Sequence, residues 1–195
     1  MVAIIDYRAG NTESLLSACR ELGIEAKLVN DIKTVALCDA VIIPGVGAFK
    51  AAIENLKTAG LFDILKNIDK PILGICLGMQ ILFERSYEGE ETEGLGFIKG
   101  EVIKIPVNAR LPHIGWNSLS NTGEDVYFVH SYMANIVSEC IVSYVDYGGI
   151  RIPAIVKYKN VTGFQFHPEK SGKYGLKLLK EWYCNIEGYK CLKKE

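Results

Sequence analysis

Apolar runs of strand length alternate with helical patterns through the first half of the chain. Val2 to Ile5 and Val41 to Ile43 are uninterrupted apolar runs, which is typical of strands buried in a parallel sheet. Between them, apolar residues recur at helical spacing from Leu15 to Leu22. This alternation predicts an α/β fold with a doubly wound, mostly parallel central sheet flanked by helices. Further strands are expected at 25–29 and 71–75. Further helical patterns begin at residues 49 and 61, and another extends from 79 to 83.

The second half of the chain changes character. Residues 87–96 are acidic and glycine-containing, which indicates an exposed loop. Short β-type runs follow and predict antiparallel strands packed beside the parallel core, before a last amphipathic helix around Leu176 to Tyr183. No linker-like stretch divides the chain, so one domain spanning 1–195 is expected. The β-type runs are 102–105, 126–129, 140–147, 155–158 and 161–166.

Composition narrows the class of protein. The 195 residues are 49% hydrophobic with a formal net charge of −1, which fits a globular three-layer core and gives no reason to expect nucleic-acid binding. No apolar run approaches the ~20 residues of a membrane span, and the N-terminus does not resemble a signal peptide. The six cysteines form no CxxC pair and suggest free thiols of a reducing compartment, so a cytoplasmic protein is expected.

A cysteine between two glycines, in Gly74-Ile75-Cys76-Leu77-Gly78, follows the apolar run that ends at residue 73. Glycines on both sides let the backbone bend sharply, so the cysteine would stand exposed where the strand ends, as in a nucleophile elbow. The helix that follows would direct its N–H groups and positive dipole end at the sulfur and favour the thiolate. The alternative is a buried core cysteine beside an ordinary βα turn.

A histidine and a glutamate two residues apart, His167 and Glu169, could complete a catalytic set with Cys76. Pro168 favours an extended backbone at His167, so the two side chains would project the same way. A carboxylate beside an imidazole fixes its tautomer and stabilises the imidazolium. Two unrelated solvated residues would give the same pattern, but with a cysteine elbow the three match the nucleophile, base and orienting group of covalent catalysis.

A glycine-containing turn, Pro44-Gly45-Val46-Gly47, follows the apolar run 41–43. It would lie at the carboxyl edge of the sheet, beside Cys76, where open α/β sheets bind ligands. There a backbone N–H could act as a second oxyanion donor beside the N–H of Leu77. A phosphate-binding loop and an ordinary βα turn are the alternatives. The segment has neither the Gly-x-Gly-x-x-Gly spacing nor the Lys-Ser/Thr pair of a P-loop, however.

The two other histidines, His113 and His130, have no metal-ligand spacing to other His or Cys residues. Neither a metal nor a cofactor is therefore expected. We expect the two histidines to shape the site or a partner surface.

Taken together, these motifs resemble class I (triad) glutamine amidotransferases, and among them the glutaminase subunits of imidazole glycerol phosphate synthase. The resemblance covers essentially the whole chain and implies a flavodoxin-like fold. Met79 and the Gly115-Trp116-Asn117 block favour this family over amidotransferases of anthranilate or carbamoyl phosphate synthesis, which usually have His at the first position and lack the second. The segments that carry the resemblance are 44–49, 74–80, 112–117, 128–132 and 167–171.

The resemblance implies a role for each matching residue. Cys76 would attack the side-chain amide of glutamine, His167 would move the proton, and Glu169 would orient the imidazole. Gly47 and Gln80 match glutamine-binding positions.

The resemblance also implies an oxyanion hole made by the N–H groups of Val46 and Leu77. The glycines flanking Val46 make a peptide flip sterically cheap, which suggests that this hole is completed only on allosteric activation. The free subunit would then be nearly silent.

A partner is implied because such amidotransferases pass their ammonia to a synthetase. Here it would be the (β/α)₈-barrel cyclase subunit, which makes imidazole glycerol phosphate and aminoimidazole carboxamide ribotide. Asn11, Trp116 and Lys170 match positions at that interface, although residues 8–11 replace the family's usual Gly-Pro-Gly-Asn. The alternative is a paralogous subunit that supplies ammonia to an amidino-sugar synthetase of surface polysaccharide biosynthesis, because the same motifs would serve both.

Overall fold

A seven-stranded sheet forms the centre of the protein in the computed structural model, which describes residues 1–8, 12–106 and 109–186. The strand order is β11-β12-β13-β4-β3-β1-β2. The five strands from β13 to β2 are parallel, and β12 and β11 extend the sheet in antiparallel pairing. The predicted mostly parallel α/β sheet is thereby confirmed. The strands are β1 (Val2–Ile5), β2 (Ala26–Val29), β3 (Ala40–Ile43), β4 (Ile72–Ile75), β11 (Ile141–Tyr147), β12 (Ile150–Tyr158) and β13 (Val161–Phe164).

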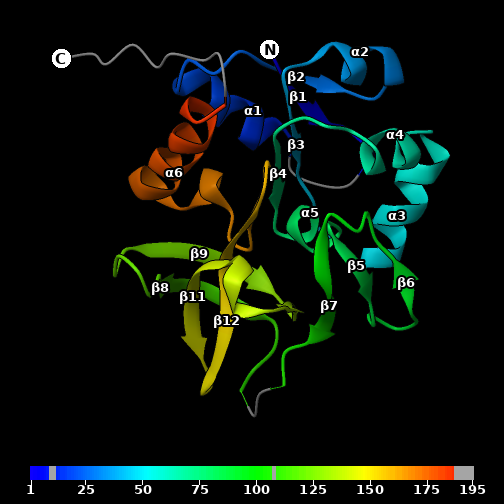
Figure 1. Ribbon diagram of the computed structural model, residues 1–195. Helices are drawn as coiled ribbons and strands as arrows, with labels where there is room; N and C mark the ends of the chain where they lie inside the picture. The colour runs from blue at the N-terminus through cyan, green and yellow to red at the C-terminus, as the bar shows by residue number, and fades with distance from the viewer. Residues whose placement is uncertain (9–11, 107–108, 187–195) are drawn as a thin grey trace.

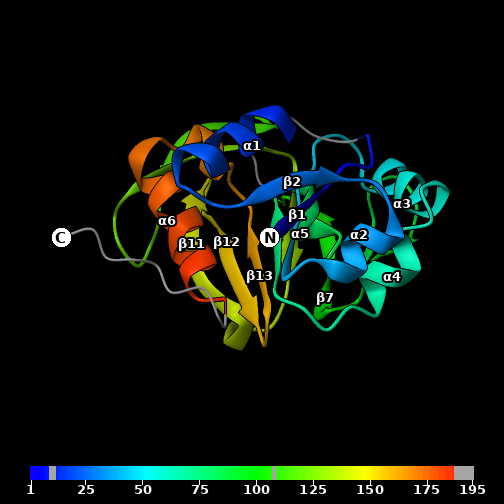
Figure 2. The same cartoon turned by 90° about the horizontal axis from the view of Figure 1, so that it is seen from above.

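Helices cover both faces of this sheet (Figure 2). Val2 and Ile4 of β1 pack into one apolar cluster with α1 and α6, whereas Ala3 and Ile5 pack into a second cluster with α3, α4 and α5. Successive side chains of a strand point to opposite faces, so a strand covered on both faces needs an unbroken apolar run. The helices are α1 (Thr12–Glu21), α2 (Ile32–Leu37), α3 (Phe49–Thr58), α4 (Phe62–Lys66), α5 (Leu77–Gln80) and α6 (Gly172–Cys184).

Two smaller β-structures lie at the carboxyl-terminal side of the parallel strands (Figure 1). One is a four-stranded sheet in the order β10-β7-β5-β6, and the other is the antiparallel ribbon of β8 and β9. Two short 3₁₀ helices complete the described structure. These elements are β5 (Phe83–Ser86), β6 (Thr92–Glu93), β7 (Ile98–Lys104), β8 (His113–Ser118), β9 (Asp125–His130), β10 (Tyr132–Asn135), η1 (Ser138–Cys140) and η2 (Pro168–Lys170).

The structure corrects three expectations about these elements. The helical pattern expected through residue 83 ends at Gln80, because Phe83 is buried in the core as the first residue of β5. The run at 161–166 does not lie beside the parallel core: β13 pairs in parallel with β4 and belongs to the main sheet. The 87–96 segment, expected to be an exposed loop, contains the short strand β6 and buries Leu95 in the core.

Four of the five cysteines in the described residues are free thiols, as expected. Cys19, Cys38, Cys76 and Cys140 are free, whereas Cys184 is disulfide-bonded, so the prediction is wrong for that residue. Disulfide formation depends on proximity in space, which the spacing of cysteines in the sequence does not reveal. No helix in the described parts of the chain is long and apolar enough to cross a membrane.

Candidate active site

Cys76 lies at a sharp turn between β4 and α5. Its backbone has φ 54° and ψ −112°, an uncommon conformation for a non-glycine residue. A Cβ atom at Gly74 would lie 2.5 Å from the Gly78 carbonyl oxygen, and one at Gly78 would lie closer than 3.0 Å to the Ile43 carbonyl oxygen. The turn therefore requires both glycines for close backbone approach. This is the strand–turn–helix geometry predicted from the sequence, but the expected exposure of the cysteine is wrong, because Cys76 is only 5% exposed.

His167 and Glu169 form a buried pair next to this turn. His167 Nδ1 lies 2.9 Å from Glu169 Oε1, and both side chains are 4% exposed. A carboxylate oxygen only accepts, so Nδ1 carries the proton and Nε2 of the neutral imidazole keeps its lone pair. Among the described residues this buried Nε2 has no hydrogen-bond partner. The backbone is extended at His167, as predicted, but Glu169 lies in η2 rather than in an extended segment.

The surroundings of His167 favour its protonated form. Burial lowers the pKa of the imidazole, but its interactions with the Cys76 sulfur and the Glu169 carboxylate outweigh burial and raise the pKa to about 9. An imidazolium beside a cysteine is the partner that a thiolate requires. The group can thus hold a proton taken from Cys76 and donate it later.

A cavity of about 280 Å³ opens beside Cys76 at the carboxyl ends of β3 and β4. This volume is just below the ~300–1,000 Å³ range of ligand pockets for drug-sized molecules and suits a metabolite of amino-acid size. All five predicted oxyanion, substrate-binding and nucleophile positions line it, whereas His167 and Glu169 are buried and do not line it. These five residues are Val46, Gly47, Cys76, Leu77 and Gln80.

Glu88 also lines this cavity and was not identified from the sequence. Its Oε2 accepts a hydrogen bond of 2.6 Å from the Phe49 N–H at the first residue of α3. Helix α3 therefore holds the carboxylate in place, since the free N–H groups at a helix start favour a negative charge. The acidic character of the 87–96 segment was the only sequence signal for this residue.

Tyr7 fixes the position of the Pro44–Gly47 turn through a hydrogen bond. The buried Tyr7 hydroxyl donates a 2.5 Å hydrogen bond to the Pro44 carbonyl oxygen, and burial raises the pKa of this phenol. A Cβ at Gly45 would lie 2.7 Å from that hydroxyl, so Gly45 is needed for packing. Gly47 has φ +100° with open space around it, so the freedom predicted for the two glycines is found only at Gly47.

His113 and His130 are buried together, so they do not form a partner surface. His130 Nδ1 lies 2.8 Å from the Tyr132 carbonyl oxygen, and His130 Nε2 lies 3.1 Å from His113 Nδ1. Burial lowers the pKa of His113, and burial lowers that of His130 to about 4. Both rings are therefore neutral near pH 7, and His130 lines the cavity. In the described residues no three His, Cys, Asp or Glu side chains are grouped to hold a metal ion.

Two of the three predicted interface residues are described, and both are exposed. Trp116 on β8 is 57% exposed and contacts the Tyr127 ring of β9 edge-on, with centroids 6.0 Å apart. Lys170 is exposed at the end of η2, and the Trp116 ring lies 4.0 Å from the Cβ position of Gly172. The ribbon and the η2–α6 junction therefore form one surface. Asn11 lies outside the described residues.

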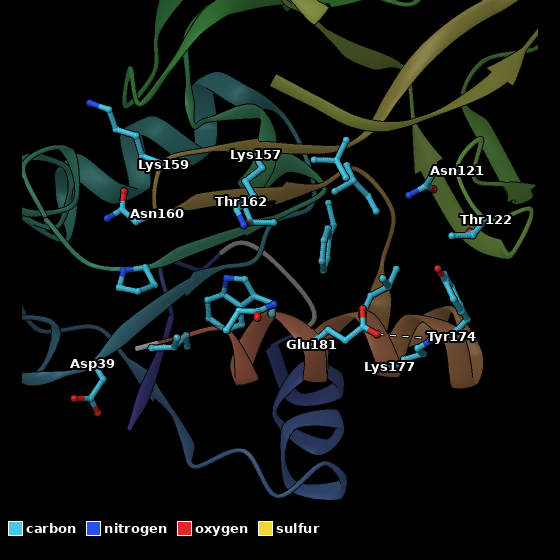
Figure 3. Close-up of a pocket in the computed structure, with 18 of the residues that line it drawn as sticks. Asp39, Asn121, Thr122, Lys157, Lys159, Asn160, Thr162, Tyr174, Lys177 and Glu181 are labelled. Carbon is cyan, nitrogen blue, oxygen red and sulfur yellow. Dashed lines mark ion pairs between the residues drawn. The ribbon is translucent and has the colours of Figure 1, made fainter. Parts of the chain in front are cut away.

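A larger cavity lies elsewhere in the described structure. It has a volume of about 870 Å³ and lies between α6 and the strands β12 and β13 (Figure 3). This cavity lies at the amino ends of the parallel strands. Its lining includes Asp39 and Asn160, which directly precede β3 and β13, and Asp69, which lies just before β4. Its walls carry charges of both signs, including the ion pair of Lys177 with Glu181 at 3.9 Å. None of the predicted site residues lines this cavity, so its size does not mark it as the reaction site.

Comparisons with known proteins identify the family of the chain. Residues 3–186 match the family described as "Glutamine amidotransferase class-I". The chain is 50% identical over 184 residues to the imidazole glycerol phosphate synthase subunit HisH of Exiguobacterium sibiricum, covering 93% of this chain and 94% of that one. It is 47% identical over 193 residues to the protein of the same name from Lactococcus lactis subsp. lactis, covering 92% and 96%.

Solved structures show the same fold at low sequence identity. A structure titled "Crystal structure of glutamine amidotransferase" has a TM-score of 0.74 and 20% identity, covering 92% of this chain and 97% of that one. A structure of PurLQS from Thermotoga maritima has a TM-score of 0.65 and 20% identity, covering 93% and 96%.

Proposed function

The chain belongs to the class I glutamine amidotransferases, and we propose that it is the glutaminase subunit of an imidazole glycerol phosphate synthase. It hydrolyses glutamine to glutamate and ammonia and passes the ammonia to a cyclase subunit. One observation carries the catalytic part of this proposal. The sulfur of Cys76 lies at a strained turn on a small cavity, beside an imidazole whose Nδ1 is held by a carboxylate.

Cys76, His167 and Glu169 act as nucleophile, base and orienting group. Nε2 of His167 takes the thiol proton, and the sulfur attacks the side-chain carbonyl carbon of glutamine. The imidazolium then donates its proton to the departing nitrogen as the C–N bond breaks, leaving a γ-glutamyl thioester and ammonia. Water attacks the thioester, His167 accepts a proton from it, and glutamate leaves with the thiol restored.

Backbone N–H groups stabilise the negative charge that develops on the carbonyl oxygen. The N–H of Leu77 belongs to the first residue of α5, and the N–H of Val46 comes from the facing turn, so both line the cavity. Glu88 supplies a carboxylate that pairs with the α-ammonium group of glutamine, since it is the acidic side chain lining this cavity. Gly47 and Gln80 complete the binding site.

The partner is the (β/α)₈-barrel cyclase, and the complex works in the cytoplasm. Trp116 and Lys170 lie on the exposed surface formed by the ribbon and η2, and this is where we place the interface. Asn11, which lies outside the described residues, is a further proposed interface residue. Both relatives named above carry the word "subunit" in their names, which supports a two-protein synthase. Binding of the cyclase shifts the Val46 peptide into its productive orientation, and the conformational freedom of Gly47 permits this change.

The decisive experiment separates ammonia production from ammonia use. Cys76→Ala should abolish product formation from glutamine by the reconstituted synthase, while product formation from added ammonium salts remains. Cys140→Ala, which removes another buried free thiol, is the matched control and should keep both activities. Equal loss with both nitrogen sources in Cys76→Ala would assign that residue a structural role. Replacing the cyclase by an amidino-sugar synthetase tests the paralogous function, which would be favoured if only that pairing consumed glutamine.

A further inference from the structure

We infer that Gln165 is a positioning residue for the nucleophile: its amide N–H, aimed by Gln80, donates to the Cys76 sulfur and favours the thiolate. This inference rests on the proposed function and deepens it. Gln165 lies between β13 and His167 and is 0% exposed. Neither its position in the sequence nor the family resemblance assigned it a role.

The contact to the sulfur is direct. Gln165 Nε2 lies 3.8 Å from Cys76 Sγ, within hydrogen-bonding reach of a large sulfur atom. The backbone on either side is fixed, because the Gln165 N–H donates to the Ala154 carbonyl oxygen at 2.9 Å and the His167 N–H donates to the Tyr127 carbonyl oxygen at 3.0 Å. The same short segment thus brings an amide and an imidazole to one sulfur.

The orientation of the amide follows from its neighbours. The Tyr132 carbonyl oxygen can only accept, so the atom of Gln80 that lies 3.0 Å from it must be the nitrogen. The same Gln80 nitrogen lies 3.0 Å from the Gln165 amide, which must therefore present its oxygen to Gln80. Only the NH₂ group of Gln165 remains to face the sulfur.

This arrangement extends away from the reacting atoms. His130 Nδ1 donates to the same Tyr132 carbonyl oxygen, and His130 Nε2 accepts from His113 Nδ1–H because both rings are neutral. Buried polar groups that are all satisfied hold one another in a single arrangement. The donor directed at the sulfur is therefore preorganised before glutamine binds.

The sulfur needs such a donor. Besides its interaction with His167, the sulfur lies 3.8 Å from the Val129 carbonyl oxygen, which accepts from a thiol but repels a thiolate. The Gln165 N–H opposes that repulsion without carrying a charge. A hydrogen bond to a charged group is worth enough to change the thiol–thiolate equilibrium by about tenfold or more.

Two variants test the inference. Gln165→Met removes the donor at similar volume, and Gln165→Glu keeps an oxygen for Gln80 but places a carboxylate oxygen at the sulfur. Alkylation of Cys76 by iodoacetamide is followed across pH by mass spectrometry of the Cys76 peptide. In both variants the pH of half-maximal alkylation should rise by about one unit or more. With the cyclase present, kcat should fall about tenfold while KM for glutamine stays within about threefold.

Val161→Ala is the matched control, because Val161 is buried at the far end of β13, the strand that leads to Gln165. It should lower the free energy of unfolding without moving the alkylation profile. A wild-type profile in folded Gln165→Glu would overturn the inference, as would an equal shift in Val161→Ala. The alkylation assay needs no substrate, so a wild-type chain that releases no glutamate even with the cyclase bound would refute the proposed function and leave this test intact.

Discussion

Acid should destabilise this protein through His130, which is buried as a neutral ring. Burial lowers its pKa from 6.5 to about 4 in the folded state, whereas the unfolded chain keeps the ordinary value. Between pH 6.5 and 4 the unfolded state therefore binds more protons than the folded state. The stability that His130 contributes is complete above pH 6.5 and is lost as the pH falls towards 4.

The size of the effect follows from the two pKa values. Each pH unit between them is worth about 1.4 kcal/mol, so lowering the pKa from 6.5 to about 4 corresponds to about 3 kcal/mol. The titratable groups whose charges act on His130 are His113, which is also held neutral, and His167. The pKa of His167 is raised, so its contribution has the opposite sign and is fully present below pH 6.5.

Comparison with His130→Asn isolates this contribution. The asparagine amide can still donate to the Tyr132 carbonyl oxygen, as Nδ1 of His130 does, but it does not titrate. Urea unfolding at pH 7 and pH 4 should show that wild type loses about 3 kcal/mol more free energy of unfolding than the variant. The contributions of the carboxylates are common to both proteins and cancel in the difference, whereas the repulsion between His167 and a charged His130 is part of the effect being measured. Equal losses would refute the reasoning, because they would mean that His130 is not held neutral by burial.

The remaining predictions concern the orienting carboxylate, the turn and the interface. Glu169→Gln should lower kcat for glutamate release less than His167→Ala, which removes general acid–base catalysis worth ~10²–10⁴-fold; equal losses would contradict an orienting role. Gly78→Ala should cost more than ~4 kcal/mol, because its Cβ would overlap a carbonyl oxygen of β3, whereas Gly23→Ala has open space and pays only for its positive φ; thermal unfolding compares the two. Trp116→Ala should weaken binding of the cyclase in a calorimetric titration while leaving the melting temperature of the free chain nearly unchanged, since the ring is 57% exposed. Unaltered affinity would remove the ribbon from the interface.

Much of this protein could be predicted from its sequence, because the relevant signals are local. An unbroken apolar run such as 41–43 indicates a strand covered on both faces, and β3 is such a strand. Gly74 and Gly78 on either side of Cys76 indicate a tight turn, and steric contact at both glycines is the physical reason. His167 and Glu169 are near neighbours in the chain, so their hydrogen bond depends mainly on backbone geometry.

Only the tertiary structure determined which residues, distant in sequence, pack against these local features. The parallel pairing of β13 with β4 brings residues 165–169 beside Cys76 across some ninety positions of sequence, and no local pattern encodes that register. Glu88 reaches the cavity only because α3 holds its carboxylate, and the pairing of β8 with β9 places His113 opposite His130. The helix after Cys76 ends at Gln80, and Phe83 is instead buried in the core as the first residue of β5. Tertiary packing of this kind overrides a local helical pattern. Long-range contacts of this kind depend on packing among elements distant in sequence, and they determine which polar groups meet at the sulfur.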